Sequence, residues 1–126
     1  MPKPGITSCT INKKVFKNLY KYSGNKVLGN YVVRIDILER LDRIIYENIN
    51  NGVYQAGFAT TQSAYELAVE KLFKTLDFLE DRLSNSQYLF GSQIVECDWR
   101  LFVTLIRFDA VYHGHFKCNQ RRIIDY

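Results

Sequence analysis

The sequence predicts an all-α fold, a helical bundle built from three amphipathic segments. Apolar residues recur at spacings of three and four within residues 35–49, 62–83 and 96–112, the period of an α-helix with one buried face. The chain has 126 residues, of which 47% are hydrophobic and 24% charged, an ordinary balance for one globular domain. These apolar faces exceed what three helices can bury against one another. We therefore expect an incomplete bundle that packs against more protein, from its own chain or from a partner.

The first predicted helix covers residues 35–49. Its apolar stripe consists of Ile37, Leu38, Leu41, Ile44, Ile45 and Ile49. Asn50, Asn51 and Gly52 are expected to end the helix, because asparagine and glycine tolerate the left-handed backbone that closes one. The next segment, residues 51–61 (NGVYQAGFATT), is small, glycine-bearing and aromatic. We interpret it as a loop that packs over the helices or lines a cleft.

The second predicted helix, residues 62–83, is the clearest element. Its inner stripe consists of Tyr65, Ala68, Leu72, Leu76, Leu79 and Leu83, widened by Val69 and Phe73. Thr60 or Thr61 can cap its start, and Ser63 with Glu66 offers an alternative capping box. Residues 84–86 (SNS) are expected to close it.

The third predicted helix, residues 96–112, follows a short apolar connector, residues 87–95. Its inner face is expected to contain Trp99, Phe102, Leu105, Ile106, Ala110 and, at its end, Tyr112. The other faces are apolar as well, and a helix that is apolar nearly all round is typically buried on several sides. Asp98 falls at the third helical position, where its carboxylate can accept the N-cap backbone N–H. We therefore assign Asp98 a folding role.

The positive charge is concentrated in a basic leader, residues 1–34, which carries seven lysines and arginines and no acid. Residues 35–126 carry ten bases and thirteen acids, so the net charge of +4 comes from the leader. Nucleic-acid binding would depend on the leader alone, which holds no recognisable motif, so no nucleic-acid partner is expected. We expect an unstructured or poorly defined leader rather than a mitochondrial targeting segment, because the leader has few serines and no arginine before Arg34. No apolar run is long enough to span a membrane, so no membrane partner is expected.

The cysteines and histidines do not form an evident reactive or metal site. Three cysteines without regular spacing argue against a disulfide framework and suit a reducing compartment. Cys9 and Cys97 lack the setting of a reactive thiol, so no catalytic residue is expected. His113, His115 and Cys118 are zinc-competent, but a structural zinc site needs four ligands. We interpret them as helix-end histidines and a buried thiol, and predict no metal site.

Four polar side chains in or beside the apolar segments are candidate site residues. Arg107 and Asp109 interrupt the third helix, and a structural ion pair is the expected explanation, with a substrate contact as the alternative. Tyr54 and Tyr112 each lie where an element ends. A tyrosine offers an apolar ring and a hydroxyl, which suits a small aromatic or phenolic ligand. From the residues alone, core packing explains both tyrosines better.

Three pieces of the sequence together carry a family resemblance. They are residues 48–62 (NINNGVYQAGFATTQ), residues 88–102 (YLFGSQIVECDWRLF) and residues 107–119 (RFDAVYHGHFKCN). The chain closely resembles the C-terminal helical domain of the xi-class glutathione transferases, also called glutathionyl-hydroquinone reductases. We accordingly divide it into the basic leader, residues 1–34, and a truncated glutathione transferase C-terminal-like helical domain, residues 35–126.

The resemblance implies a function. Family members use the cysteine of a Cys-Pro-x-Ala motif, in an N-terminal thioredoxin-like domain, to attack the sulfur of a glutathionyl-hydroquinone. A second glutathione then resolves the mixed disulfide. The helical domain contributes tyrosines that face the hydroquinone, and two of them match Tyr54 and Tyr112, the expected substrate-binding residues. The resemblance further implies glutathione as a co-substrate rather than a bound cofactor, hydroquinone conjugates as ligands, a cytoplasmic location and a homodimer.

The sequence also departs from the family pattern. Residues 1–34 do not resemble a thioredoxin-like domain, and Cys9 is followed by threonine rather than proline. The final family helices are expected to be missing, and Val95 stands where the family usually has a threonine N-cap, a loss of about 1 kcal/mol. We expect a chain that keeps the hydroquinone-side domain and is inactive alone, since phenols cannot replace a thiol nucleophile. The alternative is a non-enzymatic interaction or dimerisation module.

Overall fold

The computed structural model describes residues 26–126, with side chains described from residue 34 onward. Every regular element in this range is helical, and the one β-bridge joins Tyr88 to Gly91, so the predicted all-α class is confirmed here. The chain divides into two compact units, the first ending at Leu41 and the second running from Asp42 to Tyr126. The predicted boundary between residues 34 and 35 stays a prediction, because the leader lies largely outside the described residues. No described helix combines the length and apolarity needed to cross a bilayer.

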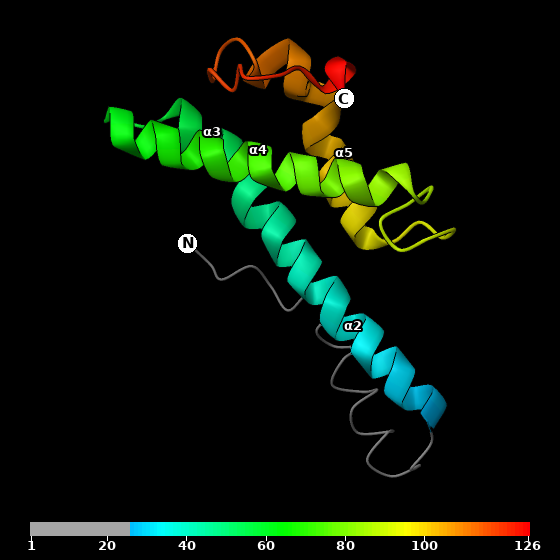
Figure 1. The fold of residues 1–126 in the computed structure, drawn as a ribbon. Helices are drawn as coiled ribbons and strands as arrows, with labels where there is room; N and C mark the ends of the chain where they lie inside the picture. The colour runs from blue at the N-terminus through cyan, green and yellow to red at the C-terminus, as the bar shows by residue number, and fades with distance from the viewer. Residues whose placement is uncertain (1–25) are drawn as a thin grey trace. The chain divides into compact units, whose positions relative to one another are not determined.

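Helix α2, Lys26–Ile45, leads into the second unit, where the remaining elements lie. These are η1 (Tyr46–Asn50), α3 (Gly52–Gly57), α4 (Gln62–Ser84), α5 (Glu96–Arg107), η2 (Phe108–Tyr112) and η3 (Ile123–Asp125). Both η1 and η2 are π-helical turns, in which the Asn51 N–H donates to the Tyr46 carbonyl and the His113 N–H to the Phe108 carbonyl, each at 2.8 Å. Helix α3 packs along α4, and α5 crosses α4 steeply in the view of Figure 1.

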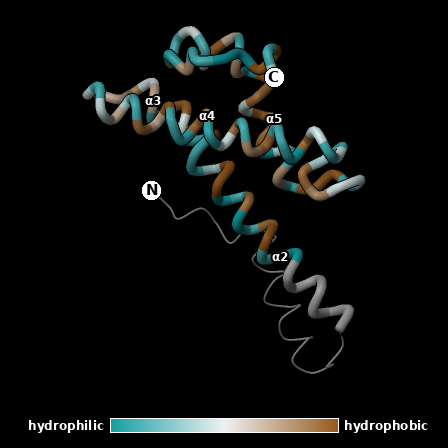
Figure 2. Tube along the Cα trace, in the orientation of Figure 1, coloured by the Kyte–Doolittle hydropathy of each residue, from teal (hydrophilic) through white to brown (hydrophobic). Residues whose placement is uncertain are grey.

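Helix α4 matches its prediction closely. The Thr61 hydroxyl accepts the Ala64 N–H at 3.2 Å, so the predicted N-cap is confirmed. The helix ends at Ser84, within the predicted SNS stop. Its inner stripe supplies much of the core, with Ala68, Val69, Leu72, Phe73, Leu76 and Leu79 buried. Figure 2 shows the consequence, since hydrophobic and hydrophilic stretches alternate along α4 as they do on a helix with one buried face.

The predicted loop over residues 51–61 is wrong for its first half, because residues 52–57 form the short helix α3. Val53 is fully buried and Ala56 nearly so, while Tyr54 and Gln55 remain exposed. Packing against α4 holds this single helical segment in place, and six residues are too few to display a helical period. The expectation that the segment packs over the helices is confirmed.

The predicted inner face of the third helix is wrong for most of its residues, although Tyr112, at its end, is buried as predicted. Trp99 is 58% exposed and Ile106 is 64% exposed, and Phe102 is also exposed. The buried stripe of α5 and η2 instead consists of Cys97, Leu101, Thr104, Phe108 and Tyr112. Because this helix is apolar on several faces, its period alone cannot select the inner one. The buried face combines large apolar residues, Leu101 and Phe108, with the smaller Cys97 and Thr104.

The start of α5 is held by Asp98, as predicted. One carboxylate oxygen of Asp98 accepts the Val95 N–H at 2.8 Å, and the other accepts the Leu89 N–H at 2.9 Å. The carboxylate therefore caps the helix and also fixes the connector that precedes it. Val95 occupies the N-cap and makes no side-chain hydrogen bond there.

Candidate functional site

The two tyrosines singled out from the sequence lie together in the second unit. Tyr54, on α3, and Tyr112, at the end of η2, bring their hydroxyl oxygens within 3.1 Å of each other. Their ring centroids are 5.6 Å apart and the planes are at 78°, an edge-to-face pair. The hydroxyl pair therefore joins two segments that are 58 residues apart in the sequence.

The two hydroxyl-bearing rings differ in their access to solvent. Tyr54 is 41% exposed, whereas Tyr112 is 3% exposed. Tyr54 is therefore the member of the pair that solvent reaches, and Tyr112 lies on its buried side. The π-helical turn η2 places Tyr112 and Phe108 on the buried side together. Such turns are rare and are frequently found at functional sites.

The environment of Tyr112 keeps its hydroxyl protonated. Burial raises the pKa of Tyr112 above its ordinary value, and the hydrogen bond between its hydroxyl and the Tyr54 oxygen adds to this effect. The positive charge of Arg107 acts in the opposite direction on the pKa and is a smaller influence. At neutral pH the pair thus holds a neutral phenol that can share its proton with the neighbouring oxygen.

Two phenylalanines complete an aromatic cluster that we define as Tyr54, Phe58, Tyr112 and Phe116. Phe58 is stacked on Tyr54, with centroids 6.4 Å apart and planes at 12°, and is 72% exposed. Phe116 presents an edge-to-face contact to each of the other three rings, at 5.4–5.6 Å. Sequence reasoning did not single out either phenylalanine, although both lie inside the quoted motifs at residues 48–62 and 107–119.

Two asparagines of η1 fix the segment that leads to Tyr54. The Asn48 amide donates to the Thr75 hydroxyl on α4 at 3.0 Å. The Asn50 amide donates to the Arg100 carbonyl at 2.9 Å and to the Thr104 hydroxyl at 2.6 Å, both on α5. These hydrogen bonds therefore hold η1, the segment before α3, against both α4 and α5. Sequence reasoning interpreted Asn50 only as a helix stop, and the two threonines on apolar helix faces were the available signal for these contacts.

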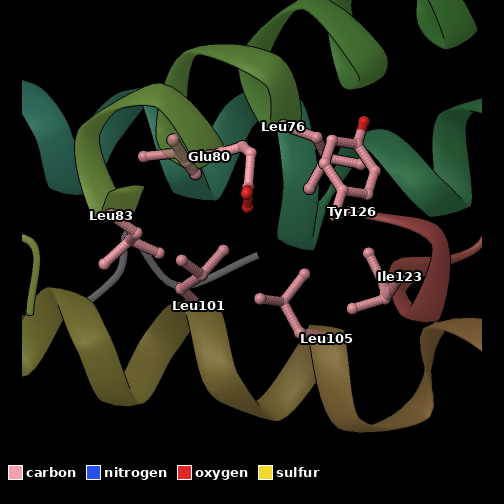
Figure 3. A pocket seen from close by; sticks show the side chains of 8 residues that line it. Leu76, Glu80, Leu83, Leu101, Leu105, Ile123 and Tyr126 are labelled. Carbon is pink, nitrogen blue, oxygen red and sulfur yellow. The ribbon is translucent and has the colours of Figure 1, made fainter. Parts of the chain in front are cut away.

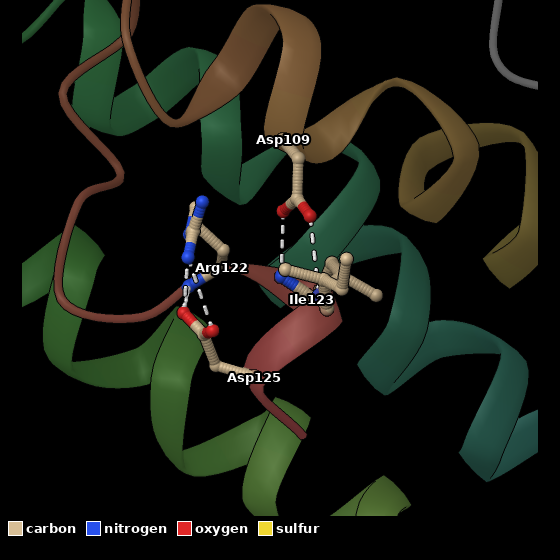
Figure 4. Close-up of polar contacts among 5 residues, drawn as sticks. Asp109, Arg122, Ile123 and Asp125 are labelled. Carbon is tan, nitrogen blue, oxygen red and sulfur yellow. Dashed lines mark hydrogen bonds and ion pairs between the residues drawn. The ribbon is translucent and has the colours of Figure 1, made fainter.

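The structure gives Asp109 a different partner from the expected Arg107. Both carboxylate oxygens of Asp109 accept backbone N–H groups, from Ile123 at 2.5 Å and from Ile124 at 3.1 Å (Figure 4). Asp109 therefore caps the start of η3 and holds η3 against η2. In the same view Arg122 and Asp125 form an ion pair at 3.2 Å beside this contact.

A separate apolar hollow of about 50 Å³ lies between α4 and α5. Figure 3 shows leucines from both helices facing one another across it, with Ile123 and Tyr126 at one end. The Tyr126 hydroxyl donates to Asp77 at 3.0 Å, which holds this end in position. Since the lining holds a single acidic side chain, Glu80, and no cluster of chemically reactive groups, we assign the hollow a packing role.

The described thiols are not suited to nucleophilic chemistry. Cys97 and Cys118 are both buried, and burial raises the pKa of the Cys118 thiol to about 12. Cys9 lies outside the described residues. Within residues 26–126 no group of three or more His, Cys, Asp and Glu side chains is arranged to hold a metal ion. The aromatic cluster is thus the feature of the second unit with the geometry of a ligand site.

Comparison with known proteins points to one family. The family model for the glutathione S-transferase C-terminal domain matches residues 62–125. Glutathionyl-hydroquinone reductase PcpF of Sphingobium chlorophenolicum is 58% identical over 89 residues, which make up 71% of this chain and 28% of that protein. Glutathionyl-hydroquinone reductase YqjG of Escherichia coli is 53% identical over 89 residues, or 71% of this chain and 27% of that protein. The chain therefore spans a little over a quarter of the length of these relatives.

Solved structures agree. The glutathione-bound structure of Escherichia coli YqjG matches with a TM-score of 0.71 at 52% identity, covering 72% of this chain and 30% of that one. Glutathione S-transferase Xi of Phanerochaete chrysosporium matches with a TM-score of 0.70 at 52% identity, covering 71% of this chain and 30% of that one. The resemblance to the xi-class helical domain is confirmed by both comparisons.

Proposed function

This chain belongs to the glutathione S-transferase C-terminal domain family, and we propose that it forms the hydroquinone-binding side of a xi-class-like glutathionyl-hydroquinone reductase. The observation that supports this proposal is the hydroxyl pair of Tyr54 and Tyr112, 3.1 Å apart inside an aromatic cluster. A hydroquinone is a flat ring with two hydroxyls, so a wall of rings and a hydroxyl donor complement both of its parts.

In this proposal three members of the cluster have a part in binding. The exposed Tyr54 hydroxyl contacts the phenolic oxygen of the ligand, and the exposed ring of Phe58 covers its face. In the proposed complex Tyr112 donates to Tyr54 from the buried side, which leaves the hydroxyl hydrogen of Tyr54 for the ligand. When a thiolate attacks the sulfur, an S–S bond forms, the bond from sulfur to the ring carbon breaks, and its electron pair passes to that carbon, which takes up a proton. A hydrogen bond to the ring hydroxyl orients the ring for this step.

The proposed reaction also needs a nucleophilic thiol, and the described cysteines do not supply it. Cleavage of a glutathionyl-hydroquinone needs a thiolate, and the buried Cys97 and Cys118 do not offer one. We therefore propose that glutathione is the co-substrate and that the nucleophilic thiol comes from outside this helical unit. A cytoplasmic location and a homodimer are further parts of the proposal, carried over from the xi-class resemblance.

Binding of hydroquinone itself to the full chain tests the proposal. In isothermal titration at pH 7, Tyr54→Phe should weaken hydroquinone binding about tenfold, the value of one hydrogen bond. Tyr112→Phe should weaken it less, because its hydroxyl acts through Tyr54. Tyr46→Phe is the matched control, since it removes an exposed phenol on η1 outside the cluster. Absence of hydroquinone binding, or equal affinity in the wild type and the Tyr54→Phe variant, would contradict the proposal.

A non-enzymatic dimerisation module is the second candidate function. The exposed apolar residues of α5 favour it, because Trp99, Phe102, Val103 and Ile106 form one face of that helix. Sedimentation equilibrium of the full chain separates the candidates. A dimer that Phe102→Glu converts to monomer would support self-association through this face, and a monomer at all concentrations would exclude it.

A further inference from the structure

Phe116 is the ring on which the aromatic cluster converges. Its ring centroid lies 5.4 Å from that of Tyr54, 5.4 Å from that of Tyr112 and 5.6 Å from that of Phe58. Tyr54 also contacts the other three rings, but its centroid is 6.4 Å from that of Phe58. Phe116 carries no group that can react or donate a hydrogen bond. Any effect on a phenolic ligand must therefore act through the position of the tyrosines.

The position of Phe116 depends on the absence of a side chain at Gly57. A Cβ built on Gly57 would lie 1.9 Å from Cδ1 of Phe116, 2.8 Å from its Cγ and 3.0 Å from its Cβ. Because the clash includes the stem of the side chain, rotation of the ring alone cannot relieve it. The backbone of Gly57 is not left-handed, so space rather than conformational freedom explains glycine here.

The segment that follows η2 and carries Phe116 contains one residue in an unfavourable backbone conformation. Lys117 has a φ of 57°, in the left-handed region that a non-glycine residue adopts at a cost of about 1 kcal/mol. Two hydrogen bonds hold the turn, from the Tyr65 hydroxyl to the Lys117 carbonyl at 2.7 Å and from the Cys118 N–H to the Tyr112 carbonyl at 3.1 Å. A local cost that neighbouring contacts maintain is typical of functional segments.

We propose that Phe116, which packs directly against Gly57, is a positioning residue that fixes the Tyr54–Tyr112 hydroxyl pair for its ligand. The inference rests on the proposed function for the identity of the ligand, a phenol or hydroquinone. The geometric part, that Phe116 holds the two hydroxyls together, does not depend on any ligand.

The chain offers a matched pair of variants at the two ends of α3. Gly57→Ala places a methyl group against Phe116, whereas Gly52→Ala meets nothing closer than the Glu47 carbonyl at 3.7 Å, an ordinary contact. We expect Gly57→Ala and Phe116→Ala each to weaken hydroquinone binding about five- to tenfold, the range of lost aromatic contacts. Gly52→Ala should bind as the wild type does. In a Phe116→Ala background, the added Gly57→Ala change should cost much less than it does in the wild type, because the ring atoms at 1.9 and 2.8 Å are gone and only the Cβ of residue 116, at 3.0 Å, remains.

A readout without ligand separates positioning from a general loss of stability. With ¹³Cζ-labelled tyrosine, NMR titration should show the pKa of Tyr112 move down toward its ordinary value in Gly57→Ala and in Phe116→Ala, and stay in place in Gly52→Ala. If both variants lose stability yet keep the Tyr112 titration and hydroquinone affinity of the wild type, the inference is overturned.

The two proposals fail in distinguishable ways. If the wild type does not bind hydroquinone but the Tyr112 titration responds to Gly57→Ala and Phe116→Ala, the proposed ligand is wrong and the positioning role stands. If hydroquinone binds and Tyr54→Phe weakens it while the Gly57 and Phe116 variants bind normally, the proposed function stands and the positioning role is wrong.

Discussion

Single residues at the two main helix starts show how small chemical differences alter local stability. Thr61 and Val95 occupy the N-caps of α4 and α5 with nearly the same backbone, φ −127° and −128°. Thr61 accepts the Ala64 N–H, while Val95 cannot accept one. The equivalent donor at α5, the Asp98 N–H, reaches only the Val95 carbonyl at 3.1 Å. The two positions therefore differ by one side-chain acceptor.

We predict that Val95→Thr raises the free energy of unfolding by about 1 kcal/mol, because threonine supplies the missing acceptor at nearly constant volume. The reverse change, Thr61→Val, should lower it by about the same amount. Urea unfolding of the full chain, with the m-value unchanged, measures both. A stabilising effect of Thr61→Val, or no gain from Val95→Thr while Thr61→Val is destabilising, would show that the Asp98 N–H is already satisfied.

The candidate site was only half visible at the level of residues. Tyr54 and Tyr112 could be singled out because a phenol has recognisable binding chemistry and both match a family motif. Phe58 and Phe116 could not, because an apolar ring in a sequence carries no sign of whether it will fill a core or line a site. Their role follows from distances between rings on three different segments, which no local pattern contains.

At the scale of elements, the sequence predicted helices better than it predicted their buried faces. The bounds and cap of α4 follow from a strong period and a threonine at its start. In α5 the large aromatic residues Trp99 and Phe102 are exposed, whereas the smaller Cys97 and Thr104 are buried. Thr104 is accepted on the buried face because the Asn50 amide satisfies its hydroxyl. That compensation lies 54 residues away in the sequence.

The capping of η3 by Asp109 leads to a prediction about this element. Asp109→Ala removes the acceptor for two backbone N–H groups, so the amides of Ile123 and Ile124 should exchange with solvent about tenfold faster, the value of roughly one hydrogen bond. Asp109→Asn keeps one oxygen acceptor and should fall between. Hydrogen exchange followed by NMR measures both, and Asp81→Ala, an exposed acid on α4, is the control. Unchanged protection of both amides in Asp109→Ala would contradict the capping role.

At the scale of the whole molecule, three groups make the second unit sensitive to alkali. Burial raises the pKa of Cys118 from 9.0 to about 12 and that of Tyr126 from 10.0 to about 12, and the hydrogen bond to Asp77 adds to the second shift. The pKa of Tyr112 is also raised, again first by burial. All three groups hold their protons more strongly in the folded chain than in the unfolded one.

The direction of the pH dependence follows from these shifts. Between pH 9 and about 12 the unfolded chain has released protons that the folded chain still holds, so the unfolded state binds fewer protons. The free energy of unfolding therefore falls as the pH rises, by up to ~1.4 kcal/mol per pH unit for the fully buried Cys118 and by less for the part-exposed Tyr126. The stabilisation is fully present below pH 9 and is lost by about pH 12.

We predict that Cys118→Ala makes this loss shallower between pH 9 and pH 10, where in the unfolded chain the thiol titrates before the tyrosines. Tyr126→Phe should act above pH 10. Urea unfolding at pH steps from 7 to 11 measures each profile. Equal slopes in the wild type and Cys118→Ala between pH 9 and pH 10 would mean that the folded chain releases the thiol proton as readily as the unfolded one. In that case burial of Cys118 would not couple its ionisation to folding.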